Sequence, residues 1–146
     1  FIGDVPEDAA HEIDAALSLM NEETFFVELE GLGQFGHAKP HAVWAGVKPS
    51  PALLALQARQ ETVMQRIGLT PEPRKYTPHV TVARLSRRTT SPCEVMQYIE
   101  HNNLFAVPPF EAARFVLFSS RASRGGGPYV VERTYDLNPA FHTACE

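Results

Sequence analysis

The stretch Lys75-Tyr76-Thr77-Pro78-His79-Val80-Thr81-Val82-Ala83-Arg84 says most about the fold of this chain. Pro78 favours an extended backbone before it, and the β-branched run from His79 to Leu85 is typical of a strand. Side chains alternate between the two faces of a strand, so His79 and Thr81 are predicted to share one face. A regular strand would send Arg84 to the other face. Only a β-bulge or the end of the strand would bring it back.

Two helices and two strands are predicted before this stretch. Pro6 opens a helix with apolar residues at helical spacing that ends near Asn21. Residues 25–30 alternate as a strand, which the segment 31–33 interrupts, and residues 42–47 form a short buried strand. Ser50 and Pro51 begin a long amphipathic helix that Gly68 stops.

The remainder of the chain predicts one short helix and two strands. Ser91-Pro92 begins the helix, and residues 113–119 and 129–137 form the strands. The segment 121–128 between them is turn-rich, and its Gly125-Gly126-Gly127 lacks the Lys-Ser/Thr of a phosphate-binding loop, so we expect a hairpin turn. So many adjacent strands favour an α+β fold with antiparallel pairs over a doubly wound parallel sheet.

Composition indicates one domain spanning residues 1–146. The 146 residues are enough to bury a core, and the sequence has no run of about 20 apolar residues that could span a membrane. The N-terminus has neither an initiator Met nor a signal peptide, so we expect the natural start to lie upstream. Cys93 and Cys145 fit no metal or redox spacing, which favours a reducing compartment and therefore the cytoplasm.

Charge is distributed unevenly along the chain. Residues 1–73 hold 4 Lys/Arg and 11 Asp/Glu, a charge of -7, whereas residues 74–146 hold 9 and 6, a charge of +3. The net charge of -4 argues against non-specific binding to long duplex DNA. The basic half suits a small anionic ligand, although an uneven solvated surface explains it equally well.

His79, Thr81 and Arg84 are the candidates for chemistry. An imidazole can move a proton near neutral pH, a neighbouring hydroxyl can donate to a phosphate oxygen, and a guanidinium can clamp the phosphate. A lone His-x-Thr on a strand is nevertheless more often structural. Tyr76 and Phe115 could stack on a base, although such aromatic residues more often serve packing.

Other residues that could carry chemistry have simpler interpretations. His37 and His41 have metal-like spacing but no accompanying cluster of ligands, so we expect solvent-facing loop histidines rather than zinc. Trp44 lies in an apolar run and is expected in the core. His11 lies on the polar side of its helix, and His142 stands directly before Thr143, so neither forms a second His-x-Thr.

The residues 79–84 resemble the second signature of the two-histidine phosphoesterase superfamily, in a setting similar to the bacterial RNA 2',3'-cyclic phosphodiesterases, once called 2'-5' RNA ligases. Residues 1–5 resemble the tail of the first signature, His-x-Thr-x-x-Phe-x-Gly. Residues 35–47, residues 115–120 and Tyr129 resemble later segments of the family. The resemblance extends over nearly all of the chain, but the His and Thr of the first signature would precede Phe1.

The resemblance implies two pseudo-symmetric lobes whose antiparallel sheets face a central cleft, with helices outside and one His-x-Thr from each lobe. It implies hydrolysis of 2',3'-cyclic phosphates to 2'-phosphates without metal or other cofactor, with His79 as base and Thr81 and Arg84 on the phosphate oxygens. The implied substrates are RNA ends, tRNA-like fragments included, or small cyclic nucleotides, and 2'-5' ligation is the reverse reaction. We expect a monomer.

Two rival functions remain open. A non-catalytic module that binds nucleotides or RNA ends would keep the phosphate contacts of Thr81 and Arg84 without turnover, because the first motif is missing from residues 1–146. A structural or protein-interaction domain would have no nucleotide affinity. The residues upstream of Phe1 would distinguish these alternatives.

Overall fold

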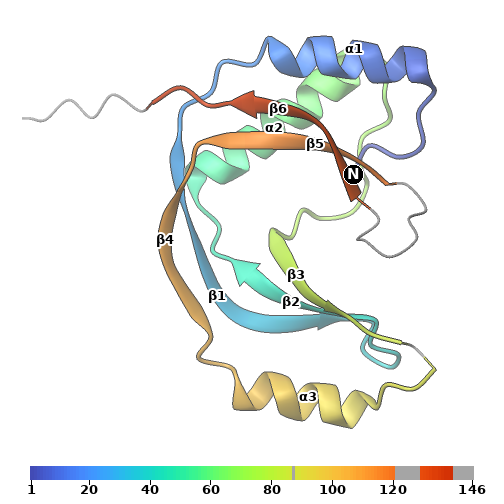
Figure 1. Ribbon diagram of the computed structural model, residues 1–146, viewed down its shortest axis with the longest axis vertical. Helices are drawn as coiled ribbons and strands as arrows, with labels where there is room; N and C mark the ends of the chain where they lie inside the picture. Colours follow the sequence, from blue (N-terminus) through green and yellow to red (C-terminus); the bar gives the residue numbers. More distant parts are fainter. Residues whose placement is uncertain (87, 121–128, 140–146) are drawn as a thin grey trace, which may run out of the picture. The chain divides into compact units, whose positions relative to one another are not determined.

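The computed structural model describes residues 1–86, 88–120 and 129–139 (Figure 1). In chain order these ranges contain α1 (Glu7–Ser18), β1 (Phe25–Phe35), β2 (Ala42–Val47), α2 (Pro51–Arg66), β3 (His79–Arg84), α3 (Pro92–His101), β4 (Ala106–Ala112), β5 (Arg114–Ser120) and β6 (Tyr129–Asp136). The predicted α+β class is confirmed. The chain divides into two compact units, each described by itself.

Unit 1 comprises Phe1–Phe25, Pro51–Arg74 and Glu111–Glu146. Its β5 and β6 pair antiparallel, which confirms that these strands form a hairpin, although the predicted turn at Gly125-Gly126-Gly127 lies outside the described residues. Helices α1 and α2 both pack against this hairpin. The core is a cluster of side chains from all three parts, namely Ile13, Leu17, Met64 and Tyr135.

The ends of the helices follow from local chemistry. Helix α2 begins at Pro51 and ends at Arg66, as predicted. Gly68 has a φ of 90°, its N–H donates to Gln65 O at 3.0 Å, and Leu69 N–H donates to Met64 O at 3.0 Å. These two bonds form a Schellman cap, which requires the left-handed conformation that glycine adopts without strain. Helix α1 ends at Ser18, slightly before the predicted Asn21.

Unit 2 comprises Phe26–Ser50 and Lys75–Phe110. Its sheet has the strand order β3-β2-β1-β4, and β2 pairs antiparallel with both of its neighbours. The prediction of a buried strand at β2 is confirmed, since Ala45 is 0% and Val43 4% exposed. Helix α3 lies across one face of the sheet (Figure 1) and buries Val95.

Two features of unit 2 differ from the predictions. The segment Gly31-Leu32-Gly33 does not end the first strand, because β1 runs on to Phe35 with a register shift between Leu29 and Leu32. Gly31 has a φ of 72°, so the glycine permits a bulge where we predicted a break. Strand β4 was not predicted at all, since Pro108 and Pro109 argue against a strand interior. It lies at the edge of the sheet, where proline is tolerated.

Among the described residues, no helix is long and apolar enough to span a membrane.

Candidate active site

His79 begins β3, an edge strand of the unit 2 sheet, and its side chain is exposed. Its Nδ1 lies 2.7 Å from Thr77 O. A carbonyl oxygen only accepts hydrogen bonds, so Nδ1 carries the proton and donates it to Thr77 O. In the neutral ring, Nε2 then has a free lone pair that can accept a proton. Pro78 holds Thr77 extended, so that its carbonyl stays in place for this bond.

A β-bulge determines which side chains share the face of His79. On β2, Val43 and Trp44 are adjacent, but their partners on β3 are Ala83 and Thr81, which leaves Val82 as the extra residue. Residues directly opposite one another on paired strands point to the same face. Arg84 pairs with Ala42, two residues from Trp44, and therefore shares the face of Thr81 and His79. The bulge that a role for Arg84 requires is therefore present.

Aromatic rings surround His79 on this face. The Phe35 ring lies 4.9 Å from the His79 ring, centroid to centroid, at 83°, and the Trp44 ring lies 6.1 Å from it at 56°. Phe35 also contacts Trp44 at 5.6 Å and stacks on His41 at 6.3 Å. Phe35 is not among the site residues predicted from the sequence. It lies opposite Ala42, and Gly33 lies opposite Trp44, in the β1–β2 pair, a register that the sequence does not show.

His41 and Trp44 differ from their predicted roles. His41 is not solvent-facing, because its Nδ1 is buried and has no hydrogen-bond partner among the described residues, whereas His37 is exposed as expected. Trp44 is only partly buried and lies beside His79 rather than in the core, while its Nε1 is buried and also lacks a partner in the part of the chain that the structure describes. The described residues contain no group of three or more His, Cys, Asp or Glu side chains arranged to hold a metal ion.

Tyr76 and Phe115 lie in different units. Tyr76 precedes β3 in unit 2, its side chain is 40% exposed, and partial burial raises its pKa above the ordinary value. Phe115 lies in unit 1, where it stacks on Tyr135 at 4.8 Å and packs against the core. These contacts give Phe115 a packing role, and stacking of either residue on a base stays a prediction.

Unit 1 contains a hollow of about 910 Å³, which none of the predicted site residues lines. Asp14, on its wall, accepts hydrogen bonds from Tyr135 Oη at 2.7 Å and from Arg133 Nε at 3.3 Å. The Tyr135 bond chiefly, and then Arg133, lower the pKa of Asp14. These bonds join α1 to β6, so Asp14 and Arg133 have a structural explanation.

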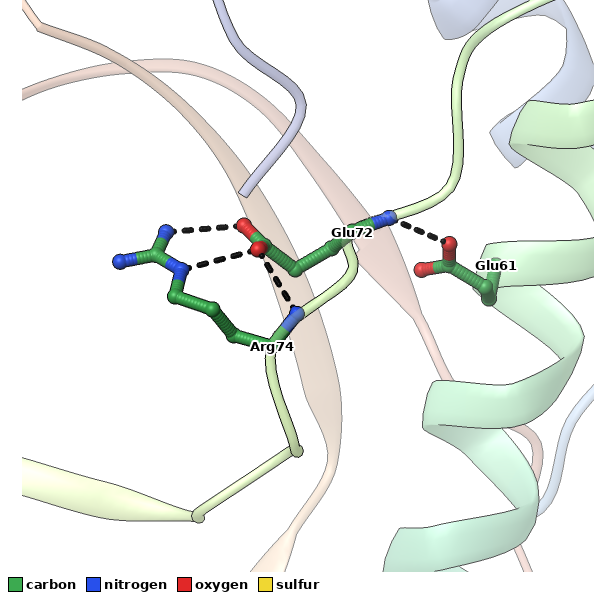
Figure 2. Close-up of polar contacts among 3 residues, drawn as sticks. All are labelled: Glu61, Glu72 and Arg74. Atoms are coloured by element: carbon green, nitrogen blue, oxygen red, sulfur yellow. Dashed lines mark hydrogen bonds and ion pairs between the residues drawn. The ribbon is translucent and has the colours of Figure 1, made fainter.

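The segment that leaves α2 toward β3 is anchored by a small polar network within unit 1 (Figure 2). Glu72 N–H donates to Glu61 Oε1 of α2 at 3.0 Å. Arg74 donates to both oxygens of Glu72, from Nε and Nη2, each at 2.8 Å. The hydrogen bonds from Arg74 lower the pKa of Glu72 to about 2.

Comparison with known proteins identifies relatives of this site's scaffold. The family model of the 2'-5' RNA ligase superfamily matches residues 1–124. An RNA 2',3'-cyclic phosphodiesterase of Aeropyrum pernix is 36% identical over 97 residues, which cover 65% of this chain and 55% of that protein. One of Archaeoglobus fulgidus is 26% identical over 98 residues, covering 66% and 55%. The chain thus spans about half the length of these curated relatives.

Solved structures share the fold. E. coli LigT complexed with 3'-AMP has a TM-score of 0.69 and 20% identity, with 94% of this chain and 73% of that chain covered. The protein TT0787 of Thermus thermophilus has a TM-score of 0.73 and 20% identity, with 95% and 75% covered. LigT has also been solved with ATP. Since its family model covers most of the sequence, the chain belongs to the 2'-5' RNA ligase superfamily.

Proposed function

We propose that this chain supplies one of the two proton-transfer groups of an RNA 2',3'-cyclic phosphodiesterase. Water attacks phosphorus and loses its proton to His79 Nε2, the bond from phosphorus to O3' breaks, and an opposing acid protonates O3' as it leaves. The product is a 2'-phosphomonoester. The acid is proposed to come from a His-x-Thr motif upstream of Phe1. The two histidines supply the acid and the base, so the proposal requires no metal-bound hydroxide.

The observation that carries this proposal is the 2.7 Å contact between His79 Nδ1 and Thr77 O. It engages one ring nitrogen and leaves the other as a proton acceptor on the exposed face of an edge strand. This favours the base role for His79 over the acid role, because the neutral ring needs no rearrangement to accept a proton from water.

Thr81 and Arg84 are proposed to hold the two non-bridging phosphate oxygens. Both share the face of His79, Arg84 because of the bulge at Val82. A hydroxyl and a guanidinium there would stabilise the charge that develops on the phosphate in the transition state. The sequence also supports an anionic substrate, because residues 75–93 include four Lys/Arg and no Asp/Glu.

The relatives indicate the substrate class. Curated relatives are named RNA 2',3'-cyclic phosphodiesterases, and a protein of the same fold has been solved with 3'-AMP. We propose RNA ends or small 2',3'-cyclic nucleotides as substrates, with 2'-5' ligation as the reverse reaction. We also propose that the sheets of two pseudo-symmetric lobes face a central cleft.

The test uses the full-length protein, including the residues proposed upstream of Phe1, with a 2',3'-cyclic nucleotide as substrate. His79→Ala should lower kcat by about 10²–10⁴-fold, the usual contribution of a general acid or base, and remove one limb of the pH–rate profile. Thr81→Val keeps the β-branched shape and should cost less, with both limbs retained. His37→Ala, an exposed histidine of the same unit, is the matched control.

Three results would contradict the proposal. A destabilised but fully active His79→Ala variant would make His79 structural. Activity that EDTA abolishes and manganese restores would refute the metal-free mechanism. Nucleotide binding without turnover by the full-length protein would instead favour a non-catalytic binding module.

A further inference from the structure

We propose that Phe35 is a positioning residue that holds the His79 imidazole in the orientation in which Nδ1 faces Thr77 O and Nε2 is the proton acceptor. The inference rests on the proposed function only in giving His79 a chemical role. The positioning itself concerns ring contacts within unit 2.

An exposed histidine on an edge strand needs more than one contact to fix its ring. Rotation about the terminal torsion of histidine has two broad minima, related by a half-turn. One half-turn would replace Nδ1 with a carbon facing Thr77 O and lose that hydrogen bond. Phe35 meets the imidazole at 4.9 Å and 83°, so its ring blocks part of the rotation path.

Phe35 is itself held by neighbouring rings, and two glycines make room for them. A Cβ on Gly33 would overlap the Trp44 ring, and a Cβ on Gly36 would overlap Lys39 O and approach His41 Nδ1 to 2.6 Å. Gly36 also has a φ of 84°, which favours glycine. The segment Gly33-Gln34-Phe35-Gly36 therefore lacks side chains at the two places where Trp44 and His41 pack against Phe35.

The consequence for chemistry is a fixed tautomer. With Nδ1–H bonded to Thr77 O, the neutral His79 ring has its lone pair at Nε2. Free histidine in water prefers the opposite tautomer, in which Nε2 carries the proton. In that tautomer Nε2 cannot accept a proton from water. Loss of Phe35 should let the His79 ring turn to solvent and adopt that tautomer.

The test measures the tautomer of His79 by ¹⁵N NMR of the full-length protein, with the His79 signals assigned from their loss in His79→Gln. The parent should show Nδ1–H, and Phe35→Leu should shift the ring toward Nε2–H. Phe35→Tyr, which keeps the ring, should retain Nδ1–H. Phe26→Leu makes the same change on β1 at a side chain that is 58% exposed and should change nothing.

Kinetics add a second readout. Phe35→Leu should lower kcat about tenfold, which is less than the about 10²–10⁴-fold that loss of a general base costs, with KM little changed. If Phe35→Leu loses its folded amide spectrum, Phe35→Met, which is unbranched and fills irregular gaps, takes its place.

An unchanged His79 tautomer in the folded Phe35 variant would overturn the inference. Failure of the proposed function looks different. In that case His79→Ala would remain active, although the Phe35 variant would still change the tautomer.

Discussion

Gly33→Ala should displace Trp44 and destabilise the protein, although it adds a single methyl group. Gly33 pairs with Trp44 across β1 and β2, and a Cβ at this position would overlap the six-membered ring of the indole. The backbone of Gly33 is not in the left-handed region, so alanine is not strained there. Any cost therefore comes from the ring, which has to move.

Two effects of opposite sign decide the magnitude. Replacing glycine by alanine at a compatible position stabilises by about 0.4–1 kcal/mol, because the unfolded chain loses freedom. Overpacking typically costs about 1–3 kcal/mol, so the clash should win. At about 2–4 °C for each kcal/mol, we expect Tm to fall by up to about 10 °C. Trp44 is the protein's single tryptophan, so its fluorescence reports the displacement directly.

A double-mutant cycle tests whether Trp44 is the cause. Trp44→Phe removes the atoms that the new Cβ would meet, so in that background Gly33→Ala should be neutral or stabilising by up to about 1 kcal/mol. Equal destabilisation in both backgrounds would refute the reasoning and assign the cost to the backbone.

Two further predictions concern unit 1. The pKa of Glu72 is lowered to about 2 from an ordinary 4.5, so its contribution to stability is complete above pH 4.5 and is lost as the pH falls toward 2. Arg74→Gln should flatten the pH dependence of urea unfolding in that window, and an unchanged slope would contradict the role of the pair. Tyr135→Phe removes the hydroxyl that donates to Asp14 and should lower Tm by about 2–4 °C, with faster amide exchange in α1. Tyr98→Phe, at an exposed tyrosine, should have no such effect.

The predictable elements are those whose signals are local. The start of α2 follows from the fixed φ of Pro51, and its end follows from the left-handed conformation that Gly68 adopts without strain. Strand β2 is a short apolar run bounded by turn residues, and Ala42, Val43 and Ala45 are buried. In each case the residues within a few positions of the boundary determine it.

The elements that were missed depend on a place in the sheet, which composition does not reveal. Pro108 and Pro109 are compatible with β4 only because β4 lies at the edge, where it lacks a neighbour on one side in the described sheet. The segment Gly31-Leu32-Gly33 is predicted to interrupt a strand, and Gly31 instead permits a bulge within β1. The effect of Pro or Gly on a strand therefore depends on the partner strand, which the sequence does not show.

The candidate site shows the same limit most clearly at Arg84. Alternation along His79-Val80-Thr81-Val82-Ala83-Arg84 correctly places His79 and Thr81 together, and by the same rule it places Arg84 on the wrong face. Nothing in the hexamer marks Val82 as the extra residue, because the bulge exists only in the register between β3 and β2. Deleting Val82 would leave Arg84 opposite Ala42 and on the same face. The face of Arg84 thus depends on its partner on β2 and not on its distance in sequence from His79.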